Sequence, residues 1–176
     1  MGWSIGVGGA PQEKELDVFF KTVGKALWFA QEYEHKCLYV AQIAKLENKI
    51  KNNPSITDFI SLLENTQEEK RLHQAIVLLG KEISEDEISL LLKAKDARNF
   101  IAHEVAQIGR LYGIRKGNLR QILTEKTDAL RAHLKVLVAG DNLVSSWVYF
   151  LEESKAGYVP EIAKSYERQI TNWIFS

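Results

Sequence analysis

The sequence has little of several features that define common protein classes. Its only cysteine is Cys37, which excludes an internal disulfide framework and suits a reducing cytosol. No apolar run reaches the roughly 18 residues that a membrane-spanning helix needs. The first eleven residues have no basic segment followed by an apolar one, so they do not read as a secretory signal. We therefore expect a cytoplasmic protein without a membrane span.

The sequence also lacks an excess of charge of either sign. Lys+Arg and Asp+Glu both number 23, which gives a formal net charge of zero. A general nucleic-acid coat protein is normally basic, so any RNA site here must be a local basic patch. With 45% hydrophobic and 26% charged residues, the composition is that of an ordinary globular protein. The 176 residues suffice for one domain with a proper core.

Apolar residues recur at helical spacing through most of the chain. They predict helices over residues 12–52, 57–64, 67–80, 85–112, 118–138, 143–154 and 161–174. Ser84 and Glu87 form a capping-box pattern before one of these helices, and Gly140-Asp141-Asn142 has the composition of a turn. We predict an all-α fold, an antiparallel helical bundle that forms a single domain over residues 12–176. A Gly-rich, flexible arm is expected at residues 1–11.

The stretch from Leu90 to Val105 contains the residues that point most clearly to chemistry, Arg98, Asn99 and His103. Asn99 and His103 are i,i+4 neighbours on one face of a helix. Arg98 lies about 140° around the axis from His103, and its long side chain leans toward the helix N-terminus. The two basic groups are therefore expected to flank a shallow patch. Small residues there allow close approach of a ligand or a second helix: Ala102, Ala106 and Gly109.

These residue types, with no cluster of metal ligands nearby, suit phosphodiester cleavage. Histidine titrates near neutral pH and can move a proton, whereas arginine offers a planar fork that matches a phosphate. Asn99 would orient the imidazole or hold a phosphate oxygen. RNA supplies its own nucleophile in the 2′-OH, so no Ser or Cys nucleophile is needed. Taken alone, however, an arginine or a histidine on a helix is more often a capping, ion-pairing or packing residue.

The string KDARNFIAHE around these residues resembles the signature of HEPN domains, which is an arginine, four to six further residues and then a histidine. A polar residue often follows the arginine in that family, as Asn99 does here, and the motif lies in a late helix of a helical domain. The resemblance implies a metal-independent endoribonuclease of the toxin or phage-defence kind, with no cofactor. It places Arg98, Asn99 and His103 in the catalytic positions. It also implies a homodimer in which two motif helices meet to complete the site on the RNA substrate.

One departure from the family concerns its regulation. HEPN toxins that a nucleotidyltransferase antitoxin modifies have a tyrosine two residues after the histidine, where this chain has Val105. The difference argues against that form of control and leaves open which antitoxin protein, if any, accompanies the chain.

The segment after the motif is basic, with four basic and no acidic residues between Val105 and Leu123. We expect Arg110, Arg115 and Lys116 to bind RNA phosphates beside the motif. The alternative is that they only compensate the dipole of the helix before them. Two other functions also remain open. The first is a non-catalytic helical module that binds RNA, a nucleotide or a partner protein through the same face. The second is a structural dimer that packs through its small residues, Ala102, Ala106 and Gly109.

Overall fold

The computed structural model describes residues 10–52, 72–80, 83–105, 107, 119–152 and 161–176. Their helices are α1 (Ala10–Asn52), α3 (Leu72–Leu79), α4 (Glu85–His103), α5 (Leu119–Glu152) and α6 (Glu161–Phe175). These ranges contain no strand, so the predicted all-α class is confirmed for the part of the chain that the structure describes. The helix predicted over 57–64 and most of the predicted N-terminal arm lie outside the described residues. None of the described helices is both long and apolar enough to cross a membrane.

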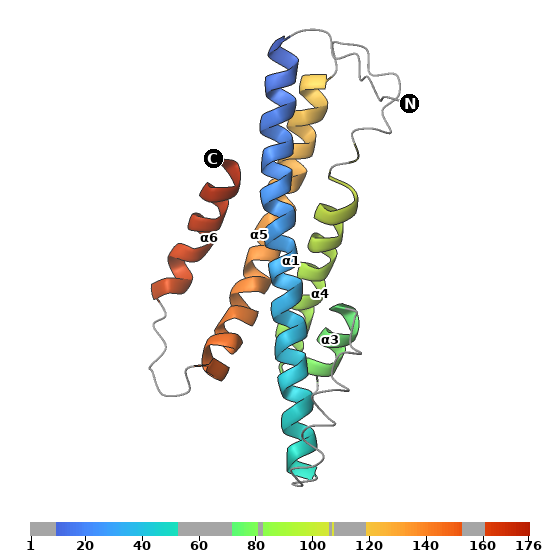
Figure 1. Ribbon diagram of the computed structural model, residues 1–176, viewed down its shortest axis with the longest axis vertical. Coiled ribbons are helices and arrows are strands. Elements are labelled where there is room, and N and C mark those ends of the chain that lie inside the picture. Colours follow the sequence, from blue (N-terminus) through green and yellow to red (C-terminus); the bar gives the residue numbers. More distant parts are fainter. Residues whose placement is uncertain (1–9, 53–71, 81–82, 106, 108–118, 153–160) are drawn as a thin grey trace.

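The long helix α1 is the element against which the others pack. Figure 1 shows α5 beside it, α4 and α3 on one side and α6 on the other. Two ion pairs join α1 to α5, Glu15 with Arg120 and Lys36 with Asp141, and the partners of both are 105 positions apart. A later residue of α1 therefore pairs with an equally later residue of α5, so α1 and α5 run in the same direction. Helix α4 runs antiparallel to both (Figure 1). The bundle is therefore not antiparallel throughout, because the chain passes through α3 and α4 before it returns beside α1.

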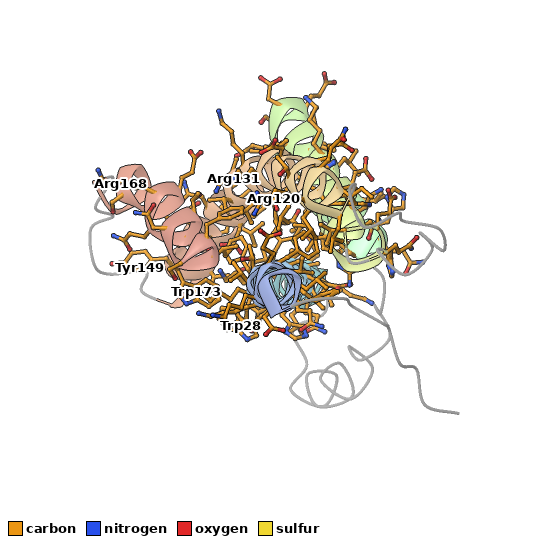
Figure 2. The ribbon with its side chains drawn as sticks, turned by 90° about the horizontal axis from the view of Figure 1, so that it is seen from above. Trp28, Arg120, Arg131, Tyr149, Arg168 and Trp173 are labelled. Atoms are coloured by element: carbon orange, nitrogen blue, oxygen red, sulfur yellow. The ribbon has the colours of Figure 1, made fainter. Side chains whose placement is uncertain are left out.

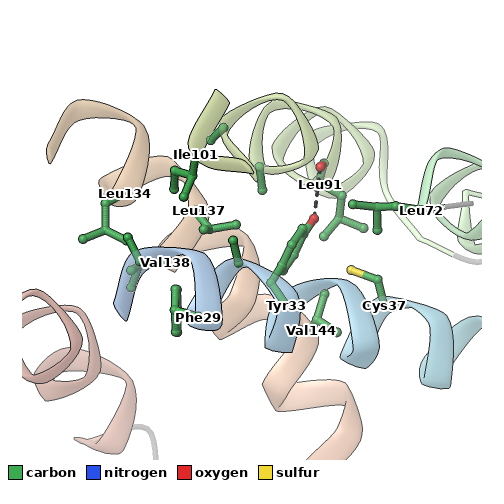
Figure 3. Packing of buried hydrophobic residues seen from close by; sticks show 14 of the residues in the cluster. Phe29, Tyr33, Cys37, Leu72, Leu91, Ile101, Leu134, Leu137, Val138 and Val144 are labelled. Carbon is green, nitrogen blue, oxygen red and sulfur yellow. Dashed lines mark hydrogen bonds between the residues drawn. The ribbon is translucent and has the colours of Figure 1, made fainter. Parts of the chain in front are cut away.

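The core is made of apolar side chains from all five of these helices, and Figure 3 shows its central part. Helix α1 supplies Phe29, Tyr33 and Cys37, which pack against residues such as Leu91 of α4 and Leu137 of α5. Fully burying a large apolar side chain contributes about 1.5–3 kcal/mol. Burial also raises the pKa of the Cys37 thiol to about 12, so this side chain packs as a small neutral group.

The start of α4 follows the sequence prediction. The hydroxyl oxygen of Ser84 accepts a hydrogen bond from the Glu87 backbone N–H at 3.3 Å, and the Glu87 carboxylate accepts one from the Ser84 N–H at 2.9 Å. Both donors would otherwise lack a partner at the first turn of the helix. The hydrogen bonds from the Ser84 hydroxyl and backbone lower the pKa of Glu87, because they favour its charged form. The predicted capping box is confirmed.

The end of α4 differs from the prediction of a helix over 85–112, because α4 ends at His103. The backbone N–H groups of Glu104 and Val105 both donate to the carbonyl oxygen of Phe100, at 2.9 and 3.1 Å. This shared acceptor closes the last turn of the helix. Val105 is fully buried, so the chain turns there to place an apolar side chain in the core. Helical periodicity alone does not reveal such an ending.

The predicted turn at Gly140-Asp141-Asn142 is wrong, because α5 continues through it without a break. Gly140 is buried, and a Cβ atom at this position would lie only 2.4 Å from Ala94 Cβ of α4. The same Cβ would lie 3.5 Å from the ring of Tyr33, whose hydroxyl donates to the Leu91 carbonyl oxygen at 3.1 Å (Figure 3). We call Tyr33, Ala94 and Gly140 the three-helix junction. Glycine at this position allows two helices to approach closely and does not form a turn.

The three-helix junction predicts opposite effects for two glycine substitutions. Gly140→Ala should lower the free energy of unfolding by about 1–3 kcal/mol, because the added methyl group has no room beside Ala94. Gly24→Ala is the matched control, because a Cβ at Gly24 meets no atom within 4 Å. That substitution should raise the free energy of unfolding by about 0.5–1 kcal/mol through helix propensity alone. Urea unfolding followed by circular dichroism measures both, and equal effects of the two substitutions would contradict the packing described.

Candidate functional site

Arg98 lies on the side of α4 that faces the core. It stands one heptad after Leu91 and one before Val105, and both of these residues are fully buried. The Arg98 side chain is only 20% exposed, and its Nη2 atom donates to the carboxylate of Glu34 on α1. The Nε atom is buried and has no hydrogen-bond partner within the described part of the chain. The arginine of the motif is therefore held in the seam between α1 and α4.

Asn99 and His103 lie on the exposed side of α4. The side-chain oxygen of Asn99 accepts a hydrogen bond from Nη1 of Arg98 at 3.2 Å, which brings these two residues together. His103 follows one turn later as the last residue of the helix. Among the hydrogen bonds and ion pairs of the described residues, none joins the His103 imidazole to Arg98 or Asn99. The structure thus pairs Arg98 with Asn99 and leaves the imidazole exposed beside them.

Helix α5 holds the end of α4 that carries His103. Lys126 donates to the backbone carbonyl oxygen of Glu104 at 3.1 Å. Two turns further along α5, the ring of His133 stacks on Phe100 with centroids 3.9 Å apart and an angle of 22° between the planes. These contacts fix the position of the last turn, while His103 itself stays exposed.

The predicted RNA-binding residues Arg110, Arg115 and Lys116 lie outside the described residues, as do Ala106 and Gly109 of the predicted small-residue patch. The structure therefore leaves these predictions as they stand.

The fourth basic residue of that segment, Arg120, lies in the first turn of α5. It donates to the Glu15 carboxylate from Nε at 3.1 Å and from Nη2 at 2.5 Å. Where the structure describes the chain, no three His, Cys, Asp or Glu side chains are grouped so that they would hold a metal ion.

Glu34 is a site residue that the sequence did not reveal. It lies 64 positions before Arg98, and its side chain is 21% exposed. In the sequence it stands in a charged stretch of the first helix, where nothing links it to the motif. Only the packing of α1 against α4 brings its carboxylate to the guanidinium. Any chemistry proposed for Arg98 has to account for this partner.

A second polar group, also missed in the sequence, lies between α1, α5 and α6. Asp141 of α5 is completely buried and accepts hydrogen bonds from Lys36 of α1 at 2.9 and 3.0 Å, one to each carboxylate oxygen. It also accepts from the hydroxyl of Tyr166 on α6 at 2.5 Å and from that of Ser145 at 3.3 Å. We call these four residues the Asp141 cluster. It joins three helices through one carboxylate.

The hydrogen bonds of the Asp141 cluster indicate that it holds helices together and does not act as a catalytic group. Lys36 lies 3.0 Å from Ser145 Oγ, a pairing that activates a serine when the amine is free to accept a proton. Here Asp141 takes hydrogen bonds from that ammonium through both oxygens, so Lys36 acts as a donor. Burial first, and then the Asp141 charge, raise the pKa of Tyr166 and keep its hydroxyl protonated.

A shallow hollow of about 370 Å³ lies where α1 meets α6, lined by Gly24, Lys25, Trp28 and Trp173. Figure 2 shows the two tryptophans next to each other at this seam. Their rings meet edge to face at 5.6 Å, and Lys25 Nζ donates to the Trp173 carbonyl oxygen at 2.7 Å. Trp28 lies about 120° around α1 from Glu34. The hollow is therefore a surface separate from the Arg98 site.

Comparison of the chain with protein-family models, with curated proteins and with solved structures gives no match in any of the three.

The Asp141 cluster predicts a large loss of stability in Asp141→Ala. Removing the carboxylate leaves the Lys36 ammonium without its partner at a site where only 28% of that side chain is exposed. We expect the free energy of unfolding to fall by about 3 kcal/mol. Amide hydrogen exchange should also quicken in α6, because Tyr166 loses its acceptor.

Arg120→Ala serves as the control for that substitution, since it removes an ion pair between α1 and α5 whose arginine is 82% exposed. It should leave the urea midpoint nearly unchanged. Similar losses in the two variants, or unchanged exchange in α6 of Asp141→Ala, would show that the cluster does not hold the three helices together.

Proposed function

We propose that the chain is a cytoplasmic, metal-independent endoribonuclease of the toxin or phage-defence kind, with a HEPN-like site that two copies of the chain complete. The observation that carries the proposal is the hydrogen bond from Arg98 Nη1 to Asn99, one turn before the exposed His103. An arginine fork, an amide and an accessible imidazole thus occur on adjoining parts of one helix. Groups of these types can transfer protons and stabilise the developing negative charge when RNA is cleaved by its own 2′-OH.

The proposed reaction is transesterification. The 2′-oxygen attacks the adjacent phosphorus, the bond from phosphorus to the 5′-oxygen breaks, and a 2′,3′-cyclic phosphate remains. One group must take the proton from the 2′-OH while another gives a proton to the leaving oxygen. A single His103 fills one of these roles, and the partner subunit's His103 fills the other when the two motif helices meet. Arg98 stabilises the pentacoordinate phosphate, and Asn99 orients the guanidinium.

The second candidate is a non-catalytic helical module that binds RNA, a nucleotide or a partner protein through the same face. One observation favours it. The charge of Arg98 is already compensated by Glu34 in the structure, so the chain offers no unpaired guanidinium to a transition state. Both candidates use the same residues, and they differ in whether an RNA linkage is broken.

Substitution of the motif residues tests the first candidate. With labelled single-stranded RNA in the presence of a chelator, Arg98→Ala should slow cleavage by about two to three orders of magnitude, because a donor to the developing charge is lost. His103→Ala should slow it by about 10²- to 10⁴-fold, through loss of a proton-transfer group. The fraction of RNA cleaved with time, resolved on a denaturing gel, gives each rate.

His35→Ala is the matched control, because His35 is an exposed histidine on α1, on a different helix from the motif. It should cleave at the wild-type rate. Cleavage by His103→Ala at that same rate would remove the imidazole from the mechanism. If the wild-type chain and both motif variants leave RNA intact but wild type still binds it, the non-catalytic module is the better description.

A further inference from the structure

The guanidinium of Arg98 has few free donors for a phosphate. Two neighbouring N–H groups are needed for a bidentate contact, and a guanidinium presents such pairs along two edges, Nε with Nη2 and Nη1 with Nη2. Both edges include Nη2, which has one N–H group on each edge, and one of these two groups donates to Glu34. Nη1 donates to Asn99, and Nε is buried without a partner in the described part of the chain. Nε is thus buried, and Nη1 and Nη2 each already make one hydrogen bond, so the guanidinium has few donors left for a phosphate.

The Glu34 carboxylate occupies the position on Arg98 that an incoming anion needs. A carboxylate and a phosphate each bind a guanidinium through two oxygens, so the two anions compete for the same N–H groups. Both side chains are about four-fifths buried, at 20% and 21% exposed, and salt screens such a pair less than a surface pair. The pair also has no net charge, so an approaching RNA backbone meets no excess positive charge at this point.

We propose that Glu34 is an internal competitor for Arg98, and that an RNA phosphate binds the site by taking the place of the Glu34 carboxylate. This anion exchange rests on the proposed RNA-binding function and adds a resting, closed form of the site to it. The opposite role, in which Glu34 holds Arg98 ready for phosphate, requires an edge of the guanidinium to stay free. Both terminal nitrogens already donate to a protein acceptor, Nη2 to Glu34 and Nη1 to Asn99, which favours competition over that role.

Glu34→Gln separates the two roles, because glutamine keeps the shape and an acceptor oxygen but removes the charge. The probe is a fluorescent single-stranded RNA with 2′-O-methyl groups throughout, which cannot be cleaved, and fluorescence anisotropy at several KCl concentrations gives its affinity. If Glu34 competes, the variant should bind about five- to tenfold more tightly than wild type.

Two further variants make the result specific to Arg98. Glu32→Gln removes a negative charge from a different face of α1 and should change the affinity less than twofold. The double variant Glu34→Gln/Arg98→Ala should bind no more tightly than Arg98→Ala alone. Weaker or unchanged binding by Glu34→Gln overturns the proposal, and so does a gain that persists without Arg98.

Inorganic phosphate distinguishes a failure of the exchange from a failure of the RNA function. Titration of 15N-labelled protein should shift the Asn99 side-chain amide at lower phosphate concentrations in Glu34→Gln than in wild type. If the shift occurs at lower phosphate concentrations in Glu34→Gln while neither protein binds RNA, the anion exchange is supported and the RNA function is contradicted. If phosphate moves the amide of both proteins equally, Glu34 does not compete.

Discussion

The close approach of α4 and α5 at the three-helix junction is the constraint on which the rest of the structure depends. Gly140 has no side chain, so the methyl group of Ala94 packs against the backbone of α5, and Tyr33 fills the space between them from α1. This contact sets the distance and rotation of α4 relative to α1. As a consequence Arg98, on the core-facing side of α4, meets Glu34 in the α1–α4 seam.

Two of the ion pairs that α1 makes have different consequences. Lys36 pairs with a completely buried carboxylate, Asp141, and the pair is enclosed by hydroxyl groups from α5 and α6. Such a contact fixes helices and has no spare hydrogen-bonding capacity for a ligand. The contact between Glu34 and Arg98 is partly exposed, and within the described residues Nε of the arginine has no acceptor. Of these two contacts, the second is the one whose charged groups are both accessible to an anion from solution.

The parts of the fold that depend on local chemistry were predictable from the sequence, and those that depend on packing were not. The capping box of Ser84 and Glu87 placed the start of α4 correctly, because both partners lie within one helical turn. The turn predicted at Gly140 was wrong. A glycine followed by an aspartate looks the same in a sequence whether it forms a turn or allows a second helix to pack closely. The partnership of Arg98 with Glu34 links positions that only the assembled bundle brings together.

The proposed function requires that the site on α4 breaks RNA by means of the RNA's own 2′-hydroxyl. The most direct measurement compares two oligonucleotides of one sequence, in chelator, of which the second has a single 2′-deoxy sugar at the mapped cleavage position. We expect the first to be cut to a product ending in 2′,3′-cyclic phosphate, identified by mass, whereas the second should not be cut at that position if the proposed function is correct. Equal cleavage of both, or no cleavage of either at high protein concentration, would contradict it.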